Sequence, residues 1–181
     1  MYSENCDICG KPAMFHTADG KGNTLSSLCN HCHNEEMAVL YDTDVPDNIP
    51  DKLSFTVRRK TSEFDIEFII FGTGKSLTAT ETGLTRRKVG VWGNLDDDFD
   101  EMMITLKNRI KNALSVKYMG KNRTIKDTKL VGYIEYNRER DDYDIYVDGI
   151  PYTWDELGKN ISIHEGWKVK IEFAEIGNDL E

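Results

Sequence analysis

The chain has 181 residues, of which 39% are hydrophobic and 30% are charged, and its formal net charge is -9. This composition is typical of a folded protein and excludes a chain that is disordered throughout. No apolar run approaches the roughly 18 residues that a membrane-spanning helix needs, so no membrane-embedded segment is expected. Residues 1–5 carry neither a basic nor an apolar stretch, and we therefore expect a cytoplasmic protein.

The negative charge is concentrated at the two ends of the chain. Residues 1–50 carry -6 and residues 121–181 carry -5, whereas residues 51–120 carry +2. An acidic protein repels phosphate backbones at long range, so nucleic-acid binding requires a local basic patch in the middle segment. Another protein is the expected partner; nucleic acid is disfavoured but stays open.

All four cysteines lie in the first 32 residues, as two Cys-x-x-Cys pairs separated by nineteen residues: Cys6 with Cys9, and Cys29 with Cys32. In a reducing compartment this spacing indicates metal ligation rather than a disulfide framework. Each pair directs two sulfurs inward from one tight turn, a knuckle, and two knuckles complete a tetrahedral zinc site. Because four thiolates leave no open coordination position, we predict one structural Zn2+.

Three histidines lie close to the cysteines in the sequence, and each is an alternative zinc ligand: His16, His31 and His33. Since four cysteines suffice, we expect these histidines to lie outside the coordination sphere. The spacer predicts a β-hairpin with strands at residues 13–17 and 24–28. Residues 33–41 predict a helix, with Glu35 and Glu36 in its first turn near the positive end of the helix dipole.

Composition divides the chain into four parts. Residues 1–41 are expected to form the zinc module, and residues 42–52, with two prolines and four aspartates, a linker. Residues 53–120 predict a four-stranded antiparallel sheet with an amphipathic helix, from alternation within 53–57, 64–70, 77–79 and 89–95 and helical spacing within 99–118. Residues 121–181 predict a β-rich unit with a short helix.

In this last part, strands are predicted at residues 130–136 and 143–147. Residues 153–156 match the capping box that begins a short helix. A closing strand is predicted from the alternation of four apolar residues, Trp167, Val169, Ile171 and Phe173. Helices packed on antiparallel sheets place the fold in the α+β class. We expect most aromatic rings of this part in a core, and any exposed rings in a partner-binding surface.

Two further motifs are better explained by structure than by ligands. Residues 71–76 resemble the end of a phosphate-binding loop, but Ile69 stands where that loop requires glycine, so we expect a hairpin turn. The acidic run of residues 96–101 lacks the glycine and the final glutamate of a calcium-binding EF-hand loop. Its position before a helical pattern predicts N-capping.

Two basic triplets form a candidate patch for an anionic partner: Arg58, Arg59 and Lys60, and Arg86, Arg87 and Lys88. In an up-and-down sheet the first strand ends where the fourth begins, so both triplets should lie at the same end. Such a patch can receive a phosphate backbone or an acidic protein surface. Three acids fall at the same end and favour a surface of salt bridges instead: Glu63, Asp65 and Glu81.

The sequence offers no recognisable catalytic set. The cysteines are assigned to metal, no Gly-x-Ser-x-Gly or His-Glu-x-x-His motif is present, and His164 is the only histidine beyond residue 33. A hydrolase with an unrecognised site stays an open alternative. The sequence favours a protein that is not an enzyme.

Residues 6–12, Cys-Asp-Ile-Cys-Gly-Lys-Pro, and residues 28–32, Leu-Cys-Asn-His-Cys, resemble the knuckles of bacterial and phage zinc-ribbon or treble-clef proteins. This resemblance covers about forty residues. It implies a bound metal. Residues 148–166 resemble uncharacterised bacterial proteins, which implies no activity. We therefore expect a non-enzymatic adaptor or inhibitor that recognises another protein, with a nucleic-acid-associated regulator as the alternative.

Overall fold

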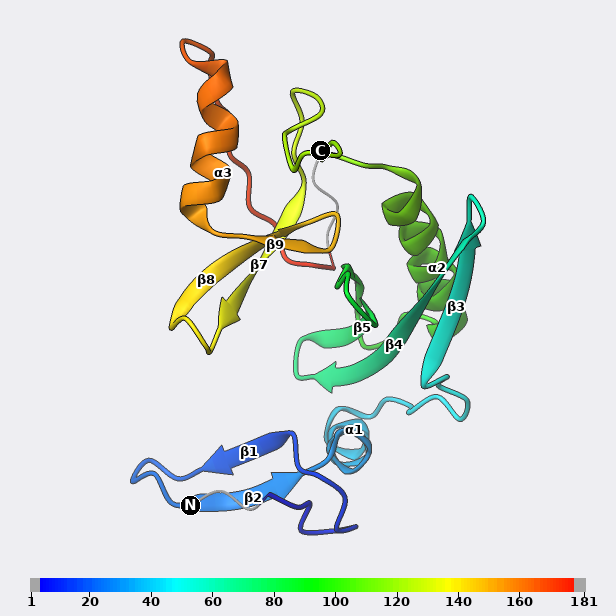
Figure 1. Ribbon diagram of the computed structural model, residues 1–181. Helices are drawn as coiled ribbons and strands as arrows, with labels where there is room; N and C mark the ends of the chain where they lie inside the picture. The colour runs from blue at the N-terminus through cyan, green and yellow to red at the C-terminus, as the bar shows by residue number, and fades with distance from the viewer. Residues whose placement is uncertain (1–3, 178–181) are drawn as a thin grey trace.

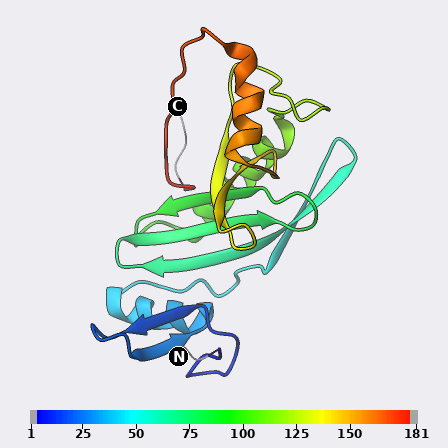
Figure 2. The same cartoon turned by 60° about the vertical axis from the view of Figure 1, so that its left-hand side comes forward.

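The computed structural model describes residues 4–177 (Figure 1). Three antiparallel sheets follow one another along the chain, with two, four and three strands. The two-stranded sheet lies below the four-stranded sheet, and the three-stranded sheet lies above it (Figures 1 and 2). With helices packed among these sheets, the α+β class predicted from the sequence is confirmed.

The N-terminal elements are β1 (Phe15–Ala18), β2 (Thr24–Leu28) and α1 (Asn30–Tyr41). The helix begins three residues earlier than predicted, because Cys29 is its N-cap and the second cysteine pair forms its first turn. The prediction that Glu35 and Glu36 lie in the first turn is therefore wrong.

The four-stranded sheet is a meander of β3 (Lys52–Val57), β4 (Lys60–Phe71), β5 (Gly74–Glu81) and β6 (Lys88–Gly93), in that spatial order. Phe71 pairs with Gly74 across a two-residue turn, so the segment that resembles a phosphate-binding loop is a hairpin turn, as predicted. The last strand ends at Gly93, two residues before the predicted Leu95.

The long helix α2 (Phe99–Ser115) covers one face of this sheet. Asp98 is its N-cap, because the Asp98 side chain accepts a hydrogen bond from the Glu101 backbone amide at 3.0 Å. The helix ends three residues before the predicted Tyr118. The Tyr118 backbone amide instead donates to the carboxylate of Asp148, at 3.1 Å, which draws this segment towards the C-terminal sheet.

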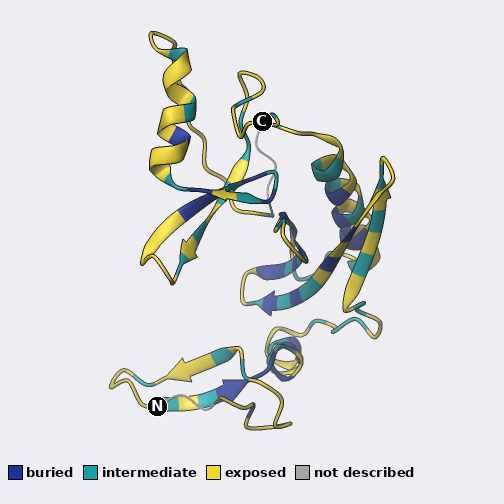
Figure 3. Cartoon of the chain, viewed as in Figure 1, coloured by how far each residue is buried: buried dark blue, intermediate teal, exposed yellow. Residues whose placement is uncertain are grey.

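The largest core lies between α2 and the four-stranded sheet (Figure 3). Its fully buried side chains alternate along β4 and β5, as the period of a strand requires. The sheet contributes Phe64, Phe68, Ile70, Leu77, Ala79 and Val91, and the helix contributes Met102, Met103, Leu106 and Ile110.

The helix α1 packs along the edge of β4 beyond the last residue that pairs with β3. There Asn34, which is only 3% exposed, donates from Nδ2 to the Phe68 carbonyl at 2.7 Å. Its Oδ1 accepts from the Ile70 amide at 2.9 Å. One side-chain amide thus takes the place of a neighbouring strand and joins the N-terminal elements to the central sheet.

The C-terminal elements are β7 (Gly132–Asn137), β8 (Asp142–Val147), β9 (Ile150–Tyr152), α3 (Trp154–Ile161) and a 3-10 turn (Ser162–His164). The predicted capping box is present, with Thr153 and Glu156 each accepting the other's backbone amide. The strand β9 was not predicted, since three residues are too few to show a period. A separate cluster of buried side chains holds these elements together: Met119, Ile145, Val147, Tyr152 and Leu157.

The predicted closing strand at residues 167–173 is wrong. Within residues 4–177 this segment belongs to no sheet, and it runs back from α3 towards the four-stranded sheet (Figure 2). Alternation shows that a segment suits a strand, but a strand also needs a neighbour with a free edge in register. The alternating apolar side chains stay exposed, from 63% at Trp167 to 79% at Phe173.

Specific hydrogen bonds join the C-terminal elements to the four-stranded sheet. The Arg86 amide donates to the Gly149 carbonyl at 2.8 Å, and a Cβ at Gly149 would lie only 2.9 Å from that same amide nitrogen. Arg109 donates from Nη1 to the carbonyls of Gly90 and Gly177, both at 2.7 Å, which fixes the end of the described chain beside β6. Among the described helices, none combines the length and the apolar character needed to cross a membrane.

Candidate metal centre

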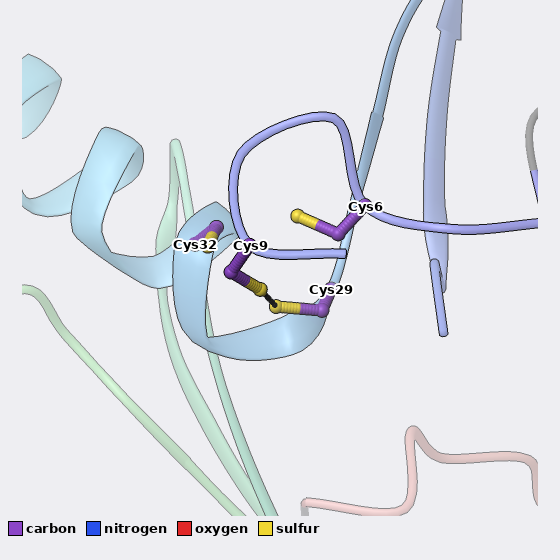
Figure 4. Close-up of side chains that lie close together, drawn as sticks. All are labelled: Cys6, Cys9, Cys29 and Cys32. Atoms are coloured by element: carbon purple, nitrogen blue, oxygen red, sulfur yellow. Dashed lines mark hydrogen bonds between the residues drawn. The ribbon is translucent and has the colours of Figure 1, made fainter. Parts of the chain in front are cut away.

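The four cysteines come together at the junction of the first knuckle and α1. Their Sγ atoms all lie within 4.8 Å of one another, and the Sγ atoms of Cys9 and Cys29 are 3.5 Å apart (Figure 4). This is the only such cluster of metal-binding side chains that the described residues form. The four side chains can hold one metal ion.

Local backbone hydrogen bonds shape the first knuckle. The Cys6 amide donates to the Lys11 carbonyl at 2.7 Å, and the Gly10 amide donates to the Cys6 carbonyl at 2.9 Å. Gly10 has φ +73°, a left-handed conformation that glycine adopts without a steric cost. The knuckle therefore closes tightly enough to aim both sulfurs inward.

Asp7 attaches the first knuckle to β2. Its amide donates to the Ser27 carbonyl at 2.8 Å, and its carboxylate accepts from the Ser27 amide at 2.7 Å. Because Cys29 follows two residues after Ser27, this pair of bonds holds the two knuckles face to face.

The cluster also forms most of the core of this part of the chain. Cys6, Cys29 and Cys32 are buried, while Cys9 is exposed. Leu28 is buried together with these three cysteines, and the partly buried Phe15 packs against the group. So small an apolar core cannot by itself offset the entropy of ordering about forty residues.

The surroundings of the sulfurs shift the pKa values of two of the thiols in opposite directions. Burial raises the pKa of Cys6, but backbone amides that donate to its sulfur outweigh this effect and lower the pKa to about 6. Burial and the neighbouring sulfurs both raise the pKa of Cys32. Four thiolates this close repel one another, and a bound cation removes that repulsion.

The donor set suits a soft metal ion. A Zn–S distance of about 2.3 Å gives sulfur–sulfur separations of about 3.8 Å in a regular tetrahedron. The separations of up to 4.8 Å therefore need only small side-chain adjustments. Four thiolates are typical of structural zinc and of iron–sulfur sites.

The three nearby histidines all have partners outside the cluster. His16 Nδ1 lies 3.1 Å from the Ser27 hydroxyl, and His31 pairs with Glu35 at 3.3 Å. His33 stacks on Phe15 and its Nε2 lies 3.1 Å from the Ile70 carbonyl oxygen.

The six residues of the basic triplets meet different surroundings, and Lys88, the first residue of β6, is half-buried. Arg58, Arg59 and Lys60 are exposed at the turn between β3 and β4. Arg86 pairs with Glu135 at 3.8 Å, and Arg87 is buried against Glu81 at 2.5 Å.

Three members of the triplets nevertheless line one cavity, of about 330 Å³: Arg58, Lys60 and Arg87. Lys117, which follows α2, lines it as well. Sequence reasoning missed Lys117, because nothing in the sequence relates a lysine after the helix to a turn almost sixty residues earlier.

Two regions of the chain match family models. Residues 5–44, which contain all four cysteines, match a domain of unknown function (DUF7685), and residues 114–177 match a second domain of unknown function (DUF7713). No curated protein and no solved structure matches the chain. The first match contains the four-cysteine cluster, and the second contains β7 to β9, α3 and the exposed apolar segment that follows.

Proposed function

We propose that this chain is a non-enzymatic zinc protein that acts as an adaptor or inhibitor by binding another protein. Zinc is the proposed metal because the four thiolates fill a tetrahedral coordination sphere. A filled sphere leaves no position for substrate or water, which favours a structural role. The reducing cytoplasm is the proposed compartment, since thiols persist there.

The proposed type of module is a treble clef. A knuckle, the β1–β2 hairpin and α1 follow in that order, with Cys29 and Cys32 at the helix start. A zinc ribbon, which ends in a strand, fits this order less well.

The observation that carries the adaptor proposal is the exposed segment of residues 167–173. Val169, Ile171 and Phe173 are at least 67% exposed and alternate with charged residues. Lys170 and Glu172 form an ion pair, which places both charges on the opposite side from the apolar groups. Extended peptides of this pattern bind partner proteins by adding a strand to an open sheet edge or by filling an apolar groove.

A pull-down from the native cell tests this proposal, with and without nuclease. The test variant replaces Val169 and Ile171 by Asp, and the matched control replaces Lys168 and Lys170 by Ser. We expect the wild type and the control to retain the same stoichiometric protein after nuclease treatment, and the test variant to lose it. Retention of the partner by the test variant would rule out this segment as the binding surface.

The second candidate function is a nucleic-acid-associated regulator. This candidate is favoured because one cavity is lined by Arg58, Lys60 and Arg87. The net charge of -9 opposes it, as do the ion pairs of Arg86 and Arg87. Loss of the captured material on nuclease treatment would support this second candidate and contradict the adaptor proposal.

A further inference from the structure

The cavity beside the β3–β4 turn is strongly basic. Of the seven residues that line it, four are cationic and one is a serine, and none is acidic. We call it the basic pocket and define it by Arg58, Lys60, Ser62, Arg87 and Lys117. These side chains come from the turn, from β4, from the residue before β6 and from the chain after α2, so only the folded protein brings them together.

Three of the cations are unneutralised by neighbours. Among the residues that the structure describes, no carboxylate pairs with Arg58, Lys60 or Lys117. Arg87 does have a partner, since its Nη1 donates to Glu81 at 2.5 Å. The four lining cations and the carboxylate of Glu81 together sum to +3.

Arg87 supplies a second, independent observation. The residue is only 9% exposed, yet its buried Nε has no hydrogen-bond partner in the described part of the chain. Buried polar groups normally have partners, and a charged donor that lacks one is especially unfavourable. Arg87 lines the basic pocket, so this donor without a partner belongs to a side chain that an anion in the pocket would contact.

The turn between β3 and β4 has a left-handed backbone at both of its central residues. Arg58 and Arg59 have φ values of +49° and +66°, the signs of a type I′ turn, whose usual residues are Asn and Gly. Two arginines in this left-handed conformation are less favourable locally than the usual residues. At Arg58, the unfavourable conformation accompanies a cation in the wall of the basic pocket.

We propose that the basic pocket binds the phosphate group of a small phosphorylated molecule. Arginine and lysine side chains are donors that phosphate oxygens prefer, and Arg58, Lys60 and Lys117 present them in the basic pocket. A volume of about 330 Å³ holds a phosphate group with part of its carrier. A long polyanion fits less well, because the acidic parts of the chain repel it.

The turn supplies a matched pair of variants. Arg58→Gly removes a cation from the basic pocket, whereas Arg59→Gly removes a neighbouring charge that does not line it. Both positions have positive φ, so glycine suits both equally. Lys117→Gln provides a second test at a site outside the turn. Arg87 is left intact, because its loss would leave Glu81 buried and unpaired.

The experiment is calorimetric titration of the full chain at about 20 mM salt, where charge interactions are weakly screened. The probes are inorganic phosphate, ribose 5-phosphate and a single-stranded DNA oligonucleotide. We expect saturable binding of the phosphate probes that weakens about tenfold or more in Arg58→Gly and in Lys117→Gln, and stays within about twofold in Arg59→Gly. Tighter binding of ribose 5-phosphate than of inorganic phosphate supports an organic carrier.

Three results would overturn the proposal. One is the absence of saturation by either phosphate probe below about 10 mM. Another is equal weakening in Arg58→Gly and Arg59→Gly, which indicates a diffuse charge effect. The third is DNA binding that exceeds the binding of both phosphate probes, which indicates a nucleic-acid surface. A failed pull-down leaves all three readouts unaffected, so this proposal is tested separately from the adaptor function.

Discussion

At the scale of single residues, Asn34 makes two buried hydrogen bonds that hold α1 against the central sheet. It is buried, and it satisfies two backbone groups of β4 that no strand reaches. A buried backbone group without a partner is costly, so the amide is needed as both donor and acceptor.

Replacement of Asn34 by Ala should lower the free energy of unfolding by about 3 kcal/mol, because the Phe68 carbonyl and the Ile70 amide both lose their partner. Chemical denaturation measures this change, and hydrogen exchange should show faster exchange of the Ile70 amide. Glu36→Ala, an exposed change in the same helix, is the control. Unchanged exchange at Ile70 would contradict the role given to Asn34.

Glu81 provides a second prediction at this scale, because its surroundings make its contribution to folding stability depend on pH. Burial raises the pKa of Glu81, but hydrogen bonds from Ser62 and the charge of Arg87 outweigh burial, so the pKa lies below its ordinary value of 4.5. A carboxylate with a lowered pKa in the folded state adds stability above the unfolded-state pKa. That stability is lost as the pH falls through the lowered value.

At about pH 7, Glu81→Gln should cost about 1–3 kcal/mol of unfolding free energy, and the difference from wild type should shrink as the pH falls below about 4. Urea denaturation over this pH range measures both quantities. Glu63→Gln, an exposed change on β4, should show no comparable loss. A difference that stays constant with pH would show that the ionised carboxylate is not responsible.

At the scale of elements, the acidic run before α2 acts through one cap. Asp98 accepts the Glu101 amide, while Asp96 is exposed and makes no hydrogen bond to the start of the helix within residues 4–177. We therefore expect Asp98→Ala to lower the unfolding free energy by about 1 kcal/mol, and Asp96→Ala to change it by less than about 0.5 kcal/mol. Thermal denaturation compares the two, and stabilisation of the wild type by calcium would instead favour a metal site.

The segment after α3 shows that alternation of apolar residues does not by itself determine whether a segment forms a strand. Its alternation is as regular as that of β4, yet β4 became a central strand and residues 167–173 stayed unpaired. The difference lies in the neighbours, since short turns deliver β3 and β5 to both sides of β4. No such turn leads from α3 into a sheet.

At the scale of the whole molecule, three clusters of buried side chains within residues 4–177 contribute to stability. The cluster around the cysteines is the smallest, and few other apolar groups support it, so we expect its stability to depend on a bound metal. Structural zinc sites supply about 10–16 kcal/mol of apparent binding free energy at neutral pH. The clusters of the four-stranded and three-stranded sheets contain no cysteine.

Removal of the metal by a chelator, or Cys32→Ser, should therefore unfold residues 5–41 while the cluster around Val147 and Tyr152 stays intact. Hydrogen exchange read by mass spectrometry distinguishes the regions, and elemental analysis should find one zinc per chain in the wild type. His31→Ser, an exposed change in the same helical turn, is the control. Full protection of residues 5–41 after metal removal would contradict a structural metal.

The sequence by itself determined whatever depends on near neighbours along the chain. The cysteine spacing, the alternation of β4, the helical period of α2 and the capping box at Thr153 each express local geometry, and each predicted an element or a site in the right place. Only the tertiary structure decided which groups meet across long separations. Asn34 at the edge of β4, Lys117 beside Arg58, and the unpaired segment after α3 all depend on how the elements pack, because partners distant in sequence leave no periodic signal.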